Sequence, residues 1–175
     1  MRFVSDFLLG SDRLIALHMA QHLVLIALVA PSLAALARLS PSPVAAWLAF
    51  DATFLFWHWP FAHGLALKIV ETATILGTAF LFWSAAFATD RLSYGARALY
   101  VMTAAVATDL PGVVMIFAPR VICAMPQENA LAFGLTPLQD QQIAGLLMWV
   151  PANLAFFSIA LFLFARWMSS HRVIA

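Results

Sequence analysis

The sequence has little charge and almost no cysteine. Charged residues make up 10% of its 175 residues and hydrophobic residues 64%, whereas a soluble domain is typically about 25% charged and half apolar. A water-soluble globule of this size could not hide so much apolar surface, so a soluble fold is excluded. The single cysteine, Cys123, excludes an internal disulfide framework.

Two functional classes are also disfavoured by what the chain lacks. There is no run of Lys and Arg, and the net charge is +1, so nucleic acid is not an expected partner. The sequence shows no nucleophile–base pair and no phosphate-binding loop, which argues against an enzyme.

Long apolar runs account for most of the chain. They cover about residues 14–37, 44–61, 67–89, 98–118 and 137–165. Roughly 20 apolar residues in a helix cross a bilayer. The sequence therefore predicts an all-α, polytopic transmembrane helix bundle of about five spans, forming a single integral membrane domain over residues 1–175.

Basic residues beside the runs indicate an orientation. With the C-terminus in the cytoplasm, the cytoplasmic side carries five arginines and the other side four basic residues, so the positive-inside rule favours this arrangement and places the N-terminus outside. Most intramembrane ionisable groups then lie in the outer half. Such groups are costly unless they are paired or hydrated, so their gathering there predicts a functional site.

A histidine pair is the sharpest local feature. His18 and His22 are four residues apart and therefore share one helical face, which lets two imidazoles bind one metal ion. The alternative is a pair of hydrogen bonds across a helix interface. His58, in the run Trp57–Pro60, is either a third ligand or a side chain that extends to the headgroups. His63, beyond the proline, is expected in a loop and is a weaker candidate.

Two acidic positions have simpler explanations beside the functional ones. Glu71 follows Lys68 by three residues, which favours a salt bridge; it could instead ligate a metal or orient a ligand histidine. Asp109 precedes Pro111 and is expected either to pair with a neighbouring helix at a kink or to join an ion path.

Residues 136–140 have the pattern of a helix start. Thr136 is the expected N-cap, Pro137 the first helical residue, and Gln139 the partner in a capping box. Asp140 then lies in the first turn, where the helix dipole favours a negative charge, and it is also a candidate metal ligand. Cys123 and Met125 add two soft sulfurs suited to Cu(I), or are ordinary loop residues.

Several of these segments resemble a known family. Residues 136–151, TPLQDQQIAGLLMWVP, are similar to the last-helix motif of the caa3-type CtaG family of cytochrome c oxidase assembly factors. HMAQH at residues 18–22 and WHWP at residues 57–60 resemble two further motifs of that family. Where family members often carry His-x-x-Glu-His, this chain has Lys68-Ile69-Val70-Glu71-Thr72, so only the glutamate remains.

The resemblance implies a function. It implies a non-enzymatic assembly factor for haem–copper cytochrome c oxidase in the bacterial inner (plasma) membrane, handling copper at the outer, periplasmic face. By motif match it implicates His18, His22, His58 and Asp140, with oxidase subunits or a copper chaperone as partners beside the bilayer. The alternatives from the residues are a haem-binding or electron-transfer protein, an ion transporter and a metal-free scaffold.

Overall fold

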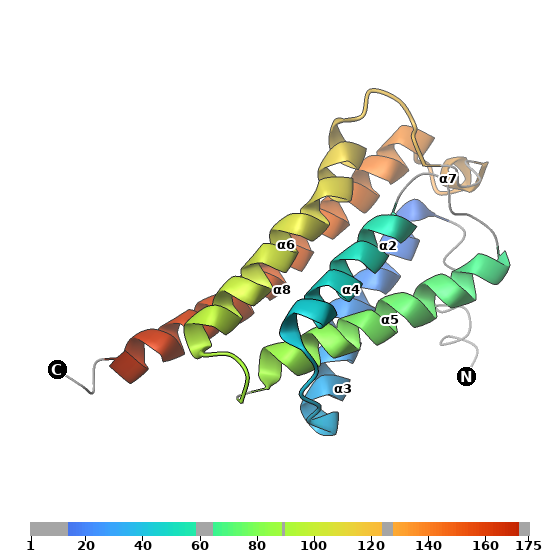
Figure 1. The fold of residues 1–175 in the computed structure, drawn as a ribbon. Helices are drawn as coiled ribbons and strands as arrows, with labels where there is room; N and C mark the ends of the chain where they lie inside the picture. Colours follow the sequence, from blue (N-terminus) through green and yellow to red (C-terminus); the bar gives the residue numbers. More distant parts are fainter. Residues whose placement is uncertain (1–13, 59–64, 89, 124–127, 172–175) are drawn as a thin grey trace.

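The computed structural model describes residues 14–58, 65–88, 90–123 and 128–171, and within these residues it is helical without strands. The elements follow one another as α2 (Ile15–Val24), the π-helical η2 (Leu25–Val29), α3 (Ala30–Ala37), α4 (Pro43–Trp57), α5 (Leu65–Phe87), α6 (Tyr94–Phe117), α7 (Glu128–Ala132) and α8 (Pro137–His171) (Figure 1). The predicted all-α bundle is confirmed.

Among the described residues, four helical stretches are long and apolar enough to cross a membrane: 15–37, 67–87, 94–117 and 137–170. The run predicted to form a span over 44–61 instead forms α4, whose 15 residues end at Trp57. At 1.5 Å per residue α4 is about 22 Å long, short of the roughly 30 Å hydrocarbon core. Pro60 explains the early end, because it has no N–H to continue the helical hydrogen bonds.

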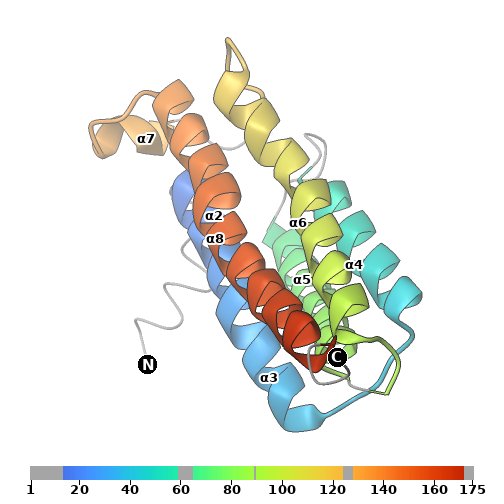
Figure 2. The same cartoon turned by 90° about the vertical axis from the view of Figure 1, so that its left-hand side faces the viewer.

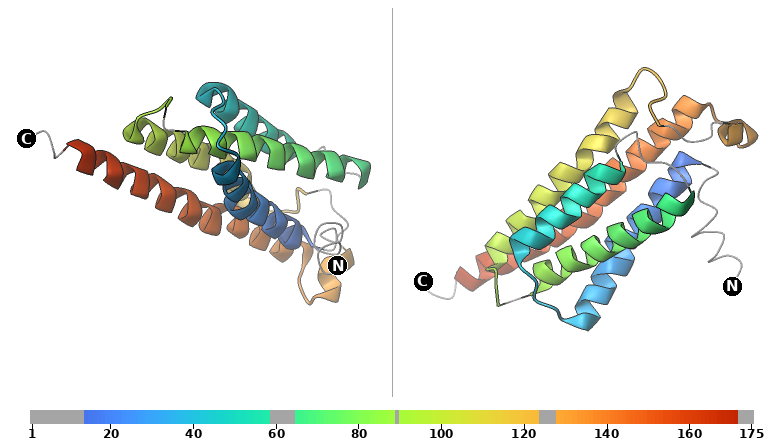
Figure 3. Two further views of the ribbon diagram at one scale, coloured as in Figure 1. Left: turned by 90° about the horizontal axis from the view of Figure 1, so that it is seen from below. Right: turned by 45° about the vertical axis from the view of Figure 1, so that its right-hand side comes forward.

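The helices lie side by side in a bundle. α6 packs most extensively on α8, α2 packs on α8, and α3 and α4 both pack on α5 (Figures 1 and 2). The end of α4, the start of α5, the end of α6 and the start of α8 gather at one end of the bundle (Figure 3). This end corresponds to the half of the membrane in which the sequence placed most ionisable groups.

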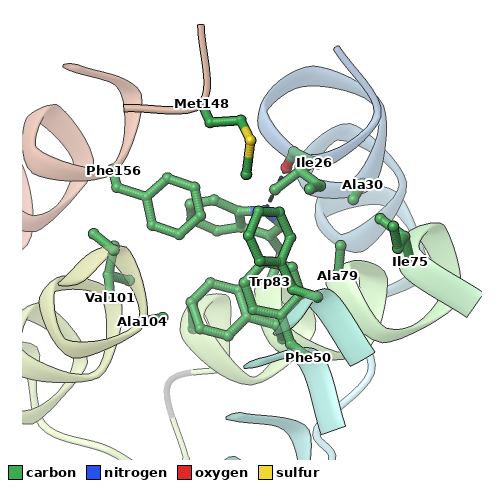
Figure 4. Packing of buried hydrophobic residues seen from close by; sticks show 14 of the residues in the cluster. Ile26, Ala30, Phe50, Ile75, Ala79, Trp83, Val101, Ala104, Met148 and Phe156 are labelled. Atoms are coloured by element: carbon green, nitrogen blue, oxygen red, sulfur yellow. Dashed lines mark hydrogen bonds between the residues drawn. The ribbon is translucent and has the colours of Figure 1, made fainter. Parts of the chain in front are cut away.

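Aromatic side chains fill the centre of the bundle. Trp83, Phe82 and Phe50 are almost completely buried, and Phe156 of α8 packs on both Trp83 and Phe82 (Figure 4). Trp83 also donates a hydrogen bond from its indole Nε1 to the carbonyl of Ile26, at 2.7 Å. This polar contact within the aromatic core fixes α5 against the first helix.

The π-helical turn explains why the Ile26 carbonyl is available. The amide of Ala30 bonds to the carbonyl of Leu25 instead of that of Ile26, and Pro31, the next residue, has no N–H to donate. Ile26 thus has no helical donor within its own segment, and a buried carbonyl without a partner is costly. Trp83 supplies the donor. Hydropathy alone does not predict this interruption of the helix.

Small residues allow α6 and α8 to approach closely. A Cβ atom added to Gly145 of α8 would lie 2.7 Å from the carbonyl oxygen of Gly112 on α6. Farther along the same interface, Asn153 donates a hydrogen bond to Asp109 at 2.8 Å, so the expected pairing of Asp109 with a neighbouring helix is confirmed.

The start of α8 has the predicted capping box. The amide of Gln139 donates to Thr136 Oγ1 at 3.2 Å, and the amide of Thr136 donates to Gln139 Oε1 at 2.8 Å. α8 extends to His171, beyond the predicted end at residue 165, and α6 begins at Tyr94 instead of residue 98 because Ser93 provides an N-cap for Ala96.

Candidate metal centre

Side chains from α2 and α5 meet in the interior of the bundle. His18 and His22 lie one turn apart on α2 and are 8% and 2% exposed. Glu71 of α5 faces them and is 8% exposed. Of the residues that the structure describes, these three form the group whose ligand atoms all lie within 4.8 Å of one another.

The carboxylate of Glu71 lies against both imidazoles. Its Oε1 is 3.1 Å from His18 Nε2 and 3.6 Å from His22 Nε2. The ring centroids of the two histidines are 4.3 Å apart. The structure places the Glu71 carboxylate beside the histidine pair, a contact between two helices that the local spacing of Glu71 and Lys68 does not reveal.

A chain of hydrogen bonds determines the tautomers of His58 and His22. His58 Nδ1 donates to the carbonyl of Phe54 at 2.7 Å, so its Nε2 carries the lone pair. That Nε2 lies 3.4 Å from His22 Nδ1, which therefore acts as the donor. The consequence is that His22 Nε2 keeps its lone pair and presents it toward Glu71.

The spacing of the donor atoms is suited to a metal ion. Metal–nitrogen bonds of about 2.0–2.1 Å in a tetrahedral site place neighbouring ligand atoms roughly 3.3 Å apart, close to the 3.1 and 3.6 Å found around Glu71 Oε1. Moreover, His22 Nε2 and His18 Nδ1 are buried and have no hydrogen-bond partner. Unpaired buried polar atoms are uncommon in proteins, so each needs an explanation.

Asp140 connects the start of α8 to the start of α2. Its two oxygens accept hydrogen bonds from the backbone amides of Ile15 at 2.8 Å and Ala16 at 3.1 Å. These amides open α2, whose N-cap residue, Leu14, offers no side-chain acceptor. Asp140 therefore caps α2 from α8 and holds the turn that carries His18.

The remaining predicted candidates fall in two groups. His63 and Met125 lie outside the described residues. Cys123 is half-buried in the segment after α6, and its backbone amide and that of Ile122 donate to Gln141 Oε1 at 3.2 and 2.7 Å. Burial raises the pKa of the Cys123 thiol to about 11, with a further contribution from the charge of Asp140.

Glu71 lies beside the histidine pair in the structure, and Gln141 makes contacts that the sequence did not predict. Glu71 was a secondary candidate because the local i, i+3 spacing pointed to Lys68. Gln141 is completely buried and also donates from Nε2 to the carbonyl of Met115 at 3.1 Å. These partners belong to other segments of the chain, so local sequence patterns do not reveal them.

The comparisons with known proteins identify a family. The family model for the cytochrome c oxidase caa3 assembly factor matches residues 34–170. The matched region includes His58, Glu71 and Asp140 and begins after the histidine pair on α2. No curated protein and no solved structure matches the chain.

Proposed function

The chain belongs to the cytochrome c oxidase caa3 assembly factor family, and we propose that it assists oxidase assembly by binding copper between α2 and α5. The site would lie toward the outer face of the bacterial plasma membrane, with the N-terminus outside and the C-terminus in the cytoplasm. Oxidase subunits or a copper chaperone would be its partners.

The convergence of His18, His22 and Glu71 carries this proposal. Two imidazoles of α2 and a carboxylate of α5 meet in a buried site, and their donor atoms have the spacing of metal ligands. Imidazole nitrogen suits copper as well as zinc. The family connection to a copper-containing oxidase favours copper over zinc.

We assign different roles to the five candidates. His18, His22 and Glu71 would bind the ion directly. His58 would orient His22 by accepting its Nδ1 hydrogen, as outer partners of metal ligands commonly do. Asp140 would hold the start of α2 and thereby the position of His18.

The same geometry favours a small ion over haem, the main alternative. Axial ligands of one haem approach the iron from opposite faces of a planar macrocycle. Here both histidines belong to one helical turn, and Glu71 Oε1 lies within 3.6 Å of a nitrogen of each. Because the Glu71 carboxylate lies beside both imidazoles, the site suits a single ion better than a haem. We infer a binding function without catalysis.

Copper binding by the purified protein and its variants tests this assignment. Glu71→Gln and His22→Ala should each lower copper affinity by more than the roughly 10–100-fold expected for loss of an outer partner. His58→Ala should fall within that range. Asp109→Asn, which changes a carboxylate outside the cluster, serves as the matched control and should leave affinity unchanged.

The outcomes separate the alternatives. A wild-type protein without bound copper, or Glu71→Gln with unchanged copper affinity, would refute the site. A strong haem absorption band in the purified protein would favour the haem alternative. Loss of assembled oxidase in membranes of cells that produce only Glu71→Gln would connect the site to the family function.

A further inference from the structure

A cavity of about 350 Å³ adjoins the candidate metal centre. His18, His58 and Glu71 are among the residues that line it. Three sulfur-containing side chains also line it: Met19 of α2, Met115 of α6, and Cys123 from the segment after α6. The remaining lining side chains are aliphatic, aromatic or proline. The cavity thus joins an imidazole–carboxylate group to three soft donors in apolar surroundings.

The sulfur atoms come from parts of the chain that are held firmly. Met19 and Met115 are 7% and 5% exposed and belong to the interior of the bundle. Cys123 lies in a non-helical segment, but Gln141 fixes its backbone from the buried face of α8. Three separate elements therefore bring sulfur to one cavity, which no local sequence motif encodes.

A second observation points to a ligand in this cavity. His18, which lines it, is more than nine-tenths buried, and its Nδ1 has no hydrogen-bond partner. A buried nitrogen of this kind is satisfied by a bound ion or a polar ligand. Thioether and thiol donors select soft ions such as Cu(I), whereas hydrated divalent ions prefer oxygen and nitrogen.

We propose that this cavity is a cuprous-ion entry chamber, in which Met19, Met115 and Cys123 receive Cu(I) before His18, His22 and Glu71 hold it. The inference rests on the proposed copper-binding function and adds the oxidation state and the route. The thioethers bind the ion without losing a proton. Cys123 coordinates as a thiolate after its proton passes to solvent.

The test measures how fast the purified protein takes Cu(I) from its coloured complex with bicinchoninate. In the double variant Met19→Leu/Met115→Leu, the rate should fall roughly tenfold, which corresponds to about 1.4 kcal/mol of barrier stabilisation. Adding Cys123→Ala should slow uptake further. Copper bound at equilibrium should remain close to the wild-type value, because the histidines and Glu71 are intact.

Met102→Leu is the control. Met102 lies on α6, as Met115 does, and does not line the cavity. Leucine replaces methionine with little change of volume, so this variant should take up Cu(I) at the wild-type rate. Uptake of Zn(II) should be the same in the methionine variants as in the wild type, since the thioethers contribute little to a harder ion.

A direct measurement on the wild-type protein does not depend on the folding of any variant. Silver(I), a redox-inert substitute for Cu(I), should shift the methyl resonances of Met19 and Met115 and leave that of Met102 unchanged. Wild-type uptake rates in the triple variant, or unshifted Met19 and Met115 resonances, would overturn the entry chamber and leave the proposed site standing. A wild-type protein that takes up no copper would refute both the entry chamber and the proposed metal site.

Discussion

Replacing Asp140 with alanine removes both acceptors of the amides that begin α2. The oxygens of Asp140 lie 2.8 Å from the Ile15 amide and 3.1 Å from the Ala16 amide, and both contacts are buried. A hydrogen bond to a charged group contributes about 1.5–3 kcal/mol. Since the two bonds share one carboxylate and are not fully additive, we expect Asp140→Ala to lower the free energy of unfolding by about 2–4 kcal/mol.

Two assays measure this effect. Unfolding by SDS in mild detergent gives the change in free energy, and hydrogen exchange locates it in the amides of residues 15–19. Asp140→Asn retains an acceptor but not the charge and should lose about half as much stability. Asp109→Ala is the control: its carboxylate accepts a hydrogen bond from Asn153 in a partly exposed setting, and it should cost about 1 kcal/mol or less.

The result distinguishes a cap from a metal ligand. A capping role predicts loss of stability and of amide protection at the start of α2 even when the protein is metal-free. A ligand role predicts a metal-free protein of unchanged stability that has lost copper affinity. Unchanged unfolding and exchange in metal-free Asp140→Ala would therefore refute the capping argument.

Three other predictions follow from individual contacts. Gly145→Ala would place a Cβ against a backbone carbonyl of α6 and should lower the free energy of unfolding by about 1–3 kcal/mol. A Cβ at Gly77 meets nothing within 4 Å, so Gly77→Ala should be neutral or stabilise the helix by up to about 1 kcal/mol. Thermal unfolding of the two variants checks this contrast. Trp83→Phe would leave the Ile26 carbonyl without its donor and should cost at least about 1–3 kcal/mol in the same assay. Burial raises the pKa of the Cys123 thiol to about 11, so Cys123 should react with maleimide at pH 8 about two orders of magnitude more slowly than an ordinary thiol of pKa about 8.5. The reaction rate should rise about tenfold per pH unit up to pH 10. A rate equal to that of free cysteine would contradict the burial argument.

Features that depend on one segment could be predicted from the sequence. Apolar run length predicted the helices, and the spacing of Thr136 and Gln139 predicted the capping box, because both depend on residues within a few positions. The i, i+4 spacing likewise placed His18 and His22 on one face of a helix. What these patterns omit is how each helix is rotated relative to its neighbours.

The missed features all depend on that rotation. Glu71 has Lys68 on its own helix and two histidines on another, and local spacing revealed only the first alternative. Asp140 had a sufficient explanation within α8, yet its oxygens cap α2. The π-helical turn required both Pro31, which is visible in the sequence, and Trp83, whose place opposite Ile26 follows only from the packing of α5.

The adjacent residues Asp140 and Gln141 connect the fold to the proposed chemistry. Successive residues on a helix point about 100° apart, so neighbouring side chains of α8 reach different partners. Asp140 holds the amides that open α2, the helix of His18, while Gln141 holds the backbone of Cys123. One turn of α8 thus holds the two segments that bring an imidazole and a thiol to the same cavity. The motif at residues 136–151 therefore has a positioning function in this fold, and the proposed metal-binding atoms lie on the helix and segment that it holds.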